Sequence, residues 1–214
     1  MITVPEATKT IVERSRYLSE AISKRLINYS SLARYIKPEL EEMLIKKVSQ
    51  GSIIMALKRL EDDFKPRYNP QTIFTESPEM AVRSNLYYVC IPNKETAGLA
   101  LLISREALER SFYCQIKGIH ETVFVLSQDL YDKFDVTINN KTKVIEPIKV
   151  SGLTIYIPDE AYKASGIYYF FLKSLAWEGI NVIEVVSTIH ELTFIIEEPE
   201  IERAFKVIKS IFVK

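Results

Sequence analysis

The later part of the chain contains an internal repeat. The triplet Ile-His-Glu occurs at 119–121 and again at 189–191, each copy leads into an apolar run, and the two histidines of the sequence occupy the same place in both. Upstream of each triplet, an apolar run ends at a proline, Pro92 in the first copy and Pro158 in the second. Because an ordered set of matching segments is typical of a repeated supersecondary unit, we expect two copies of one module.

The spacing of apolar residues predicts the elements of the second copy. Residues 153–157 are β-branched and aromatic, and apolar runs follow at 181–186 and 192–196, so we expect three strands. Apolar residues at helical spacing favour helices over 167–178 and 199–211. The resulting order βαββα lacks only the final strand of a ferredoxin-like βαββαβ unit.

The missing final strand has several candidates. In the first copy, 134–138 (FDVTI) or the stretch around Val144 would supply it. A further strand candidate, 72–76 (TIFTE), precedes the first copy, so strands would be exchanged between the copies. The predicted fold class is α+β: an N-terminal helical bundle followed by two ferredoxin-like βαββαβ modules, at 84–148 and 149–214.

Two segments of the second copy have a specific pattern. A glycine precedes the first helix in Gly166-Ile167-Tyr168-Tyr169-Phe170, and Gly179-Ile180-Asn181-Val182 joins that helix to the next strand. With Val186-Ser187-Thr188 and the closing run Leu192-Thr193-Phe194-Ile195-Ile196, the second copy resembles an ACT domain, most like those at the C-terminus of aspartokinases. The first copy resembles it less, because Arg110-Ser111-Phe112 stands where Gly-Ile-Asn would fall.

The ACT resemblance implies that a small ligand, usually an amino acid, binds where ACT units pair, and hence a homodimer or higher homo-oligomer. A loop ending at Ser165-Gly166 would present the free N–H groups of a helix start to a carboxylate. Asp159 and Glu160 would meet an ammonium group, and Asn181 would reach the ligand of a neighbouring unit. The predicted ligand-binding residues are Asp159, Glu160, Ser165, Gly166, Ile167, Asn181 and Val182.

A purely structural role is the alternative for each polar group of this set. Ser165 would then only cap the helix, since serine is favoured at that position. Asp159 and Glu160 would be solvated, and Asn181 would satisfy a turn.

The first part of the chain, residues 1–66, is predicted to be helical, and 67–83 is a proline-containing linker with the extra strand candidate. The segments Ser31–Ile36 and Val48–Leu60 resemble a helix-turn-helix, with Ser49 capping the recognition helix. A separate short helix starting at Pro38 would make the connection between them longer than the usual turn. The alternative is a helical domain that only packs or dimerises.

The charge distribution agrees with contact to DNA without requiring it. The chain has 28 Lys and Arg against 28 Asp and Glu, but residues 1–68 carry 13 basic and 9 acidic side chains. A basic face that follows phosphates would therefore lie on the helical domain. The predicted DNA-binding residues are Lys46, Lys47, Ser49, Gln50, Ser52 and Lys58.

Several classes of protein are not expected. The N-terminus lacks the apolar core of a signal peptide, and no apolar run has the length of a membrane helix, so a cytoplasmic protein without membrane association is predicted. The sequence has no GxxxxGK[ST], GxGxxG or GxSxG motif and no CxxC pair. We therefore expect no enzyme activity, no cofactor and no metal, and we expect His120 and His190 to stabilise turns.

Two functional hypotheses follow. The first is a non-enzymatic regulator that binds an amino acid through its ACT-like modules and controls transcription through its N-terminal helices. The second is a stand-alone regulatory subunit or interaction module of an amino-acid biosynthetic enzyme, such as an aspartokinase, without DNA binding.

Overall fold

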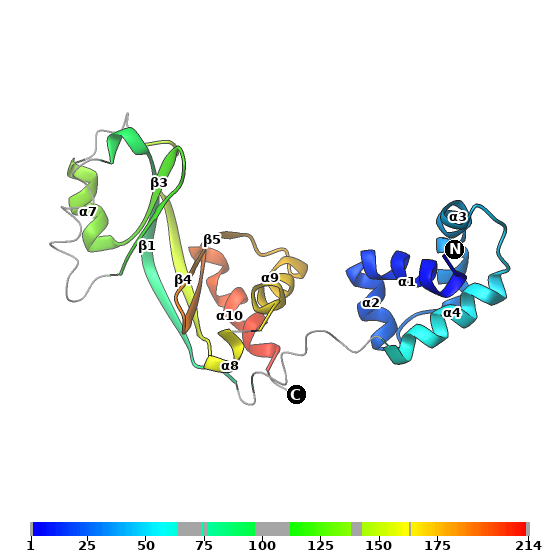
Figure 1. The fold of residues 1–214 in the computed structure, drawn as a ribbon. Helices are drawn as coiled ribbons and strands as arrows, with labels where there is room; N and C mark the ends of the chain where they lie inside the picture. The colour runs from blue at the N-terminus through cyan, green and yellow to red at the C-terminus, as the bar shows by residue number, and fades with distance from the viewer. Residues whose placement is uncertain are drawn as a thin grey trace. The chain divides into compact units, whose positions relative to one another are not determined.

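The computed structural model describes residues 2–63, 74, 77–96, 112–137, 143–162 and 164–212. The chain divides into two compact units, Met1–Asn69 and Pro70–Lys214. Figure 1 shows helices in the first unit and a sheet with helices in the second.

The described part of the first unit is helical, as predicted. Its helices are α1 (Val4–Arg14), α2 (Arg16–Ser23), α3 (Tyr29–Leu44) and α4 (Gln50–Asp63). Helix α1 begins with a capping box, in which Thr3 and Glu6 each bond the other's backbone N–H. Apolar side chains from all these helices form one core, which includes Ile11, Ile22, Ile36 and Leu57.

The structure corrects the prediction that a separate helix starts at Pro38. Helix α3 continues through this proline to Leu44. A proline inside a helix removes one backbone hydrogen bond and costs about 3 kcal/mol. Ile36 and Leu40, on either side of it, are buried in the core, so tertiary packing offsets this cost. Only residues 45–49 therefore connect α3 to α4, and the long connection expected from the sequence does not exist.

The second unit contains a six-stranded antiparallel sheet in the order β2-β3-β1-β4-β6-β5. The strands are β1 (Met80–Pro92), β2 (Tyr113–Lys117), β3 (Glu121–Ser127), β4 (Ile148–Tyr156), β5 (Val182–Ser187) and β6 (Glu191–Glu197). The helices are α7 (Gln128–Thr137), α8 (Asp159–Tyr162), α9 (Ile167–Trp177) and α10 (Ile201–Ser210), with short 3-10 turns η1 (Asn93–Glu95) and η3 (Glu198–Glu200). The predicted α+β class is confirmed. The helices and the last two strands of the second copy lie close to their expected bounds, but its first strand begins at Ile148, five residues before the expected 153.

The two repeats share strands through β1 and β4. The beginning of β1, Met80–Arg83, pairs with Gly152–Ile155 of β4, and Leu86–Tyr88 pairs with Ile148–Val150. A strand segment ahead of the first copy therefore extends the second copy's sheet, and β4 extends the first copy's sheet. This is the kind of exchange between copies that the sequence suggested, although the segment lies later than predicted.

The other candidates for the missing strand are corrected. The first four residues of the run FDVTI, 134–137, form the last turn of helix α7 and not a strand. Phe134 is buried there against Phe124. Val144 donates a backbone hydrogen bond to Cys90, but β4 begins only at Ile148. Of the candidate TIFTE, only Phe74 is described, and it lies outside any strand, buried against Phe171 of α9. The rest of TIFTE and the expected first helix of the first copy lie outside the described residues.

Apolar side chains on the two faces of the sheet form separate clusters. On one face, α7 packs on the first half of the sheet, and α9 and α10 pack on the second half. The other face has a cluster that includes Leu86, Val125, Val150 and Ile195, from both halves. The two halves therefore contribute to one core on this face.

Both edge strands of the sheet, β2 and β5, contribute side chains to this second face. Cys114 of β2 and Ile183 and Val186 of β5 pack against the same cluster. Burial and then the carboxylate of Glu184 raise the pKa of the Cys114 thiol. Burial likewise raises the pKa of Cys90 to about 11, so both thiols are protonated at neutral pH.

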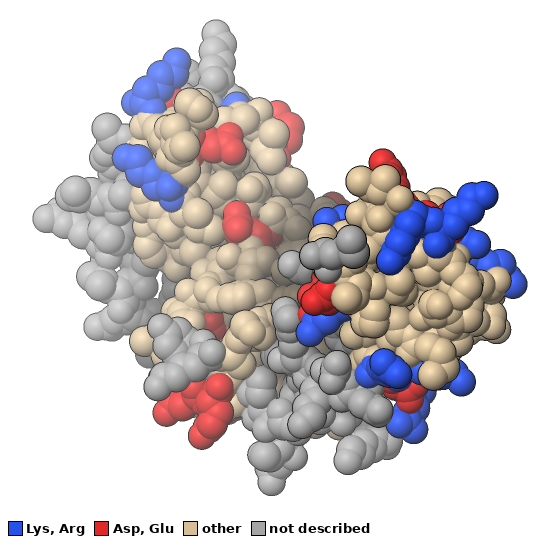
Figure 2. Space-filling model, turned by 45° about the vertical axis from the view of Figure 1, so that its right-hand side comes forward, with Lys and Arg blue, Asp and Glu red and all other residues tan. Residues whose placement is uncertain are grey.

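Charged side chains are spread over the surface of the first unit. Figure 2 shows its Lys and Arg side chains in several groups, with Asp and Glu among them. Some of these charges form ion pairs at the surface, such as Arg14 with Glu39 and Arg25 with Glu61.

Candidate ligand-binding site

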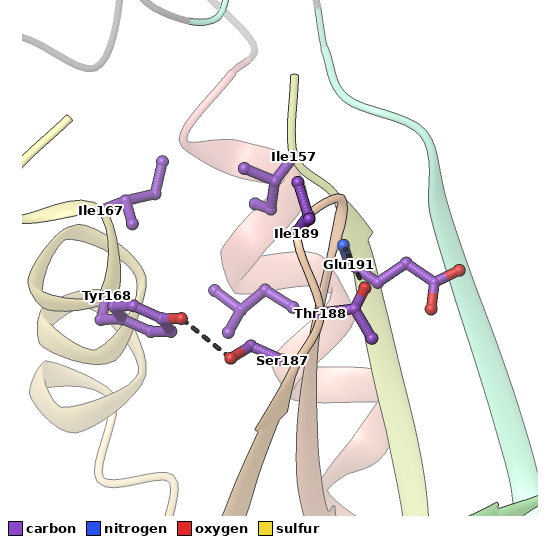
Figure 3. A pocket seen from close by; sticks show the side chains of 8 residues that line it. Ile157, Ile167, Tyr168, Ser187, Thr188, Ile189 and Glu191 are labelled. Atoms are coloured by element: carbon purple, nitrogen blue, oxygen red, sulfur yellow. Dashed lines mark hydrogen bonds between the residues drawn. The ribbon is translucent and has the colours of Figure 1, made fainter. Parts of the chain in front are cut away.

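A pocket of about 440 Å³ lies at one end of the second copy. It is formed where β4 ends, α9 begins and the hairpin between β5 and β6 turns (Figure 3). Its lining residues are Ile157, Ile167, Tyr168, Ser187, Thr188, Ile189, Glu191 and Leu192. The size is in the range of sites that hold small molecules.

Helix α9 reaches the pocket with its N-terminus. Gly166 is the N-cap, with φ of 90°, and no side chain caps this helix by a hydrogen bond. Ser165 therefore does not cap it, contrary to the structural alternative for this residue. The first turn of a helix has N–H groups without partners inside the helix, and these N–H groups with their positive dipole end favour an anion.

A hydrogen bond closes one side of the pocket. The hydroxyl of Tyr168 on α9 donates to Ser187 Oγ at the end of β5, at 2.9 Å. The hairpin is held by two bonds, from the N–H of Thr188 to the carbonyl of Glu191 and from the N–H of Glu191 to the hydroxyl of Thr188. In Figure 3 the carboxylate of Glu191 points away from Ile167 and Tyr168. Polar and apolar groups thus share the pocket surface almost equally.

Asp159 and Glu160 lie near this end of the module. Both are exposed and form the start of the short helix α8. The Oδ1 atom of Asp159 is 3.5 Å from Nδ1 of His190, which forms an ion pair only when the imidazole is protonated. His190 also stacks on Tyr156 and accepts the N–H of Ile157 through its carbonyl. This histidine therefore ties the hairpin to the end of β4.

Asn181 and Val182 do not reach the pocket of their own module. Asn181 is exposed and precedes β5, and Val182 is the first residue of that strand, whereas the pocket lies beyond its last residue, Ser187. At about 3.3 Å per strand residue, Asn181 and Ser187 are roughly 20 Å apart. Of the predicted ligand-binding residues, Ile167 lines the pocket, and Gly166 and Asp159 are near it.

The sequence pattern did not predict that the other lining residues belong to a binding site. Ile157, Ile189 and Leu192 look like ordinary core residues in an apolar pattern. The only signal is their position beside the repeated Ile-His-Glu hairpin and the proline upstream. The pocket appears only once strands far apart in the sequence are placed side by side.

Solved structures that resemble this chain include regulatory parts of aspartate kinases. The regulatory subunit of aspartate kinase from Thermus thermophilus, in ligand-free form, aligns over 65% of this chain and 100% of its own length, with 11% identity and a TM-score of 0.50. A structure of aspartokinase alpha and beta subunits aligns over 63% and 92%, with 17% identity and the same TM-score. The aspartate kinase from Clostridium acetobutylicum aligns over 64% of this chain but only 35% of its own length, with 15% identity and a TM-score of 0.50.

This is a likeness of fold. It agrees with the ACT-like resemblance of the second copy. No family model matches the chain, and the comparison with curated proteins found no match.

The same end of the first copy is built differently. Pro92 pairs with Glu121 as Tyr156 pairs with Glu191, so Asn93 stands at the position of Ile157. The alignment of Pro92 with Pro158 was therefore wrong by two residues, because the hydrogen-bonded register sets the equivalence. Asn93 donates through its side chain to the carbonyls of Gly118 and Ile119 and accepts the hydroxyl of Thr122.

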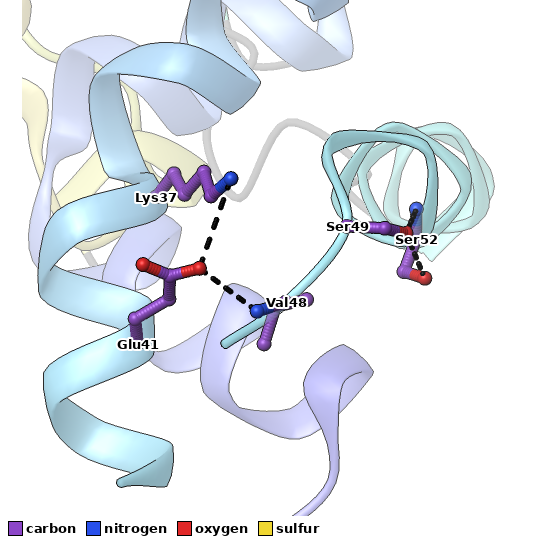
Figure 4. A network of polar contacts seen from close by, with 5 residues as sticks. All are labelled: Lys37, Glu41, Val48, Ser49 and Ser52. Carbon is purple, nitrogen blue, oxygen red and sulfur yellow. Dashed lines mark hydrogen bonds and ion pairs between the residues drawn. The ribbon is translucent and has the colours of Figure 1, made fainter. Parts of the chain in front are cut away.

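In the first unit, the predicted cap of α4 is confirmed. Ser49 Oγ accepts the N–H of Ser52 at 3.1 Å. Just before Ser49 in the chain, the N–H of Val48 donates to Oε1 of Glu41 on α3 at 2.8 Å. The same oxygen lies 3.7 Å from Nζ of Lys37 (Figure 4). These bonds position the start of α4 relative to α3.

The predicted DNA-binding residues divide into two groups. Lys46, Lys47, Ser52 and Lys58 are exposed. Gln50 is half-buried, and its side chain donates to the carbonyl of Ser30, so it does not extend freely from α4. The remaining residue of the set, Ser49, is occupied as the cap.

Within the described ranges, none of the helices has the length and apolarity that a membrane crossing requires. In the same part of the chain, His, Cys, Asp and Glu side chains do not gather in groups that would hold a metal ion.

Proposed function

We propose that this chain is a non-enzymatic, ligand-responsive regulator that binds an amino acid through its second ACT-like module. The observation that carries the proposal is the pocket at the N-terminus of α9, where no side chain caps the helix. The fold likeness to an aspartate kinase regulatory subunit supports a regulatory role.

In this proposal, separate groups of the protein bind the carboxylate and the ammonium group of the amino acid. The carboxylate of the amino acid binds the N–H groups that follow Ser165 and Gly166, including that of Ile167. Asp159 and Glu160 attract the ammonium group. Asn181 and Val182 serve a site in a paired module, since they are remote from the pocket of their own module. The active form is then a homodimer or higher homo-oligomer.

In this proposal the N-terminal helices bind DNA, and the ligand controls that binding. The short connection between α3 and α4 and the capped start of α4 are compatible with a helix-turn-helix. Lys46, Lys47 and Lys58 then contact phosphates, and Ser52 lies at the end of α4 that faces the bases. Ligand binding acts by favouring one arrangement of the oligomer, as required for any coupling between two sites.

A second candidate is a regulatory subunit of a biosynthetic enzyme that does not bind DNA. The likeness to the Thermus structure, a regulatory subunit that aligns over its entire length, supports this candidate as much as the first. In this candidate the N-terminal helices bind the enzyme.

Binding of amino acids to the full chain tests the shared part of both candidates. A ligand that binds the native state raises its apparent stability, so thermal-shift measurements with each standard amino acid should identify at least one that raises Tm. Gel-shift measurements then separate the candidates. The first requires salt-sensitive DNA binding that the same amino acid alters, whereas the second requires none.

A further inference from the structure

We propose that His190 is a positioning residue for the carboxylate of Asp159, and that it makes binding of the amino acid weaker at acidic pH. This inference rests on the proposed function, in which Asp159 attracts the ammonium group of the ligand, and it adds how that site is regulated. The neutral imidazole leaves the carboxylate to the ligand, whereas the protonated imidazole pairs with the carboxylate itself.

His190 lies in the hairpin that forms one side of the pocket. Its neighbours in the chain, Ile189 and Glu191, both line the pocket. Its carbonyl accepts the N–H of Ile157 at 2.7 Å, and its ring stacks on Tyr156 with 5.9 Å between the ring centroids and 17° between the planes. A backbone bond and a ring contact therefore hold the imidazole in a defined position beside the pocket.

The imidazole faces the start of α8. Its Nδ1 atom is buried, has no hydrogen-bond partner among the described residues, and lies 3.5 Å from Oδ1 of Asp159. The two side chains are 45% and 84% exposed, so protons reach the ring and a ligand reaches the carboxylate. A buried polar atom without a partner is unfavourable, which favours the ion pair once the ring is protonated.

Other titratable groups lie around His190. Tyr156 of β4 contacts the face of its ring, Glu191 follows it in the chain, and Glu160 follows Asp159 on α8. Within the described ranges, Asp159 is the acidic side chain that pairs with this imidazole. Histidine is the side chain that ordinarily changes its charge between about pH 5 and 8, whereas carboxylates ordinarily stay ionised and phenols neutral there.

The direction of the pH effect follows from the charges. The ammonium and carboxylate groups of a free amino acid keep their charges in this range, so the change comes from the protein. As the pH falls, the imidazolium competes with the ligand's ammonium group for Asp159, and the affinity decreases. Because both side chains are in contact with water, we expect the effect of a surface ion pair, roughly two- to fivefold.

Isothermal titration of the full chain at about pH 7.5 and about pH 5.5 tests this coupling. Each standard amino acid is used except histidine, whose own side chain changes charge in this range. Those that bind at the higher pH should bind roughly two- to fivefold more weakly at the lower pH. Equal or tighter binding at the lower pH would overturn this inference and leave the proposed function standing. Absence of binding by every amino acid would overturn the proposed function, and the inference with it.

A variant of each histidine separates this effect from other effects of acid. His190→Gln removes the titrating ring and should bind the amino acid equally at both pH values. The matched control, His120→Gln, changes the histidine of the first copy and should keep the loss of affinity seen in the wild type. Circular dichroism at both pH values verifies that each variant is folded. If His190→Gln keeps the full loss, His190 is not its cause.

Asp159→Asn keeps this test decisive if the His190 variant fails to fold. The change removes an exposed carboxylate and leaves the stacking of His190 on Tyr156 in place. It should weaken binding at the higher pH and abolish the further loss at the lower pH. A loss that persists in Asp159→Asn would overturn the pairing of His190 with this carboxylate.

Discussion

Tyr168 and Ser187 join the first turn of α9 to the last residue of β5 through a hydrogen bond of 2.9 Å. This bond spans one side of the pocket and links the helix that would bind a carboxylate to the hairpin that forms the rim. Both side chains are exposed, so the bond competes with water and its net contribution to stability is modest.

Replacing Tyr168 by phenylalanine tests this link. The Tyr168→Phe variant keeps the ring but loses the donor, and it should lower the free energy of unfolding by about 0.5–1 kcal/mol. Urea denaturation measures this change. Tyr169→Phe is the matched control on the same helix and should have no comparable effect. Equal losses in both variants would show that the bond to Ser187 is not the cause.

Gly166 is expected to be required for its backbone conformation. Its φ of 90° lies in the left-handed region, where an added Cβ costs about 1–2 kcal/mol. Gly166→Ala should therefore destabilise the chain by about this amount and weaken amino-acid binding, as measured by urea denaturation and titration.

The control for Gly166 is Gly51, in the first turn of helix α4. A Cβ at Gly51 would meet only Ser49 Oγ, at 4.0 Å, so alanine there should stabilise the chain by about 0.4–1 kcal/mol, because it reduces the conformational freedom of the unfolded state. A stabilising effect of alanine at both positions would contradict the role of the left-handed conformation at Gly166.

Lys143 and Asp135 form an ion pair beside helix α7. The Lys143 side chain is 7% exposed, and its Nζ lies 2.5 Å from Oδ1 of Asp135. Asp135→Asn removes the charge that faces this ammonium group and should cost roughly 1–3 kcal/mol. Urea denaturation at neutral pH provides the measurement. Glu202→Gln, which breaks an exposed pair with Lys206, is the control and should change stability much less.

The ion pair of Lys143 with Asp135 also predicts that the stability of the folded state changes at alkaline pH. Burial lowers the pKa of Lys143, but its hydrogen bond with Asp135 and the nearby charges of Tyr131 and Asp135 raise that pKa by more. A raised lysine pKa stabilises the folded state below the unfolded value of 10.5, and this contribution is lost as the pH rises through the folded pKa. The stability difference between wild type and Asp135→Asn should therefore narrow above about pH 10.5. A constant difference across this range would refute the assignment.

Lys46 and Lys58 are expected to contact phosphates if the N-terminal helices bind DNA. Each of Lys46→Gln and Lys58→Gln should weaken binding to any sequence and reduce the slope of log K against log salt by about 1. Fluorescence anisotropy at several salt concentrations measures this slope. The control is Lys94→Gln in the second unit. The same slope in all variants would argue against this face and favour the regulatory-subunit candidate.

Much of the local structure could be predicted from the sequence because it depends on neighbouring residues. Apolar spacing indicated the helix 167–178 and the strands around it, and Ser49 was identified as the cap of the following helix. The glycine at 166 marked a helix start. These features depend on propensity, periodicity and capping within a few residues, so they need no knowledge of distant contacts.

Other features depended on contacts between distant segments. Helix α3 continues through Pro38 because its flanking residues are buried in a shared core. Residues 134–137 are helical because Phe134 packs on the sheet, although the run FDVTI alone favours a strand. Local preference was overruled in both cases by the packing of the surrounding structure.

The sequence by itself determined that the chain repeats one α+β module and that helices precede it. Only the tertiary structure decided which strands pair, since Met80–Arg83 lies beside β4 through backbone bonds that any side chains would permit. It also decided the register that places Asn93 of the first copy at the position of Ile157 in the second, and with it which residues of the two copies correspond. The physical reason is that a site formed by three strands and a helix depends on relative positions, whereas a sequence pattern records only each element's own neighbours.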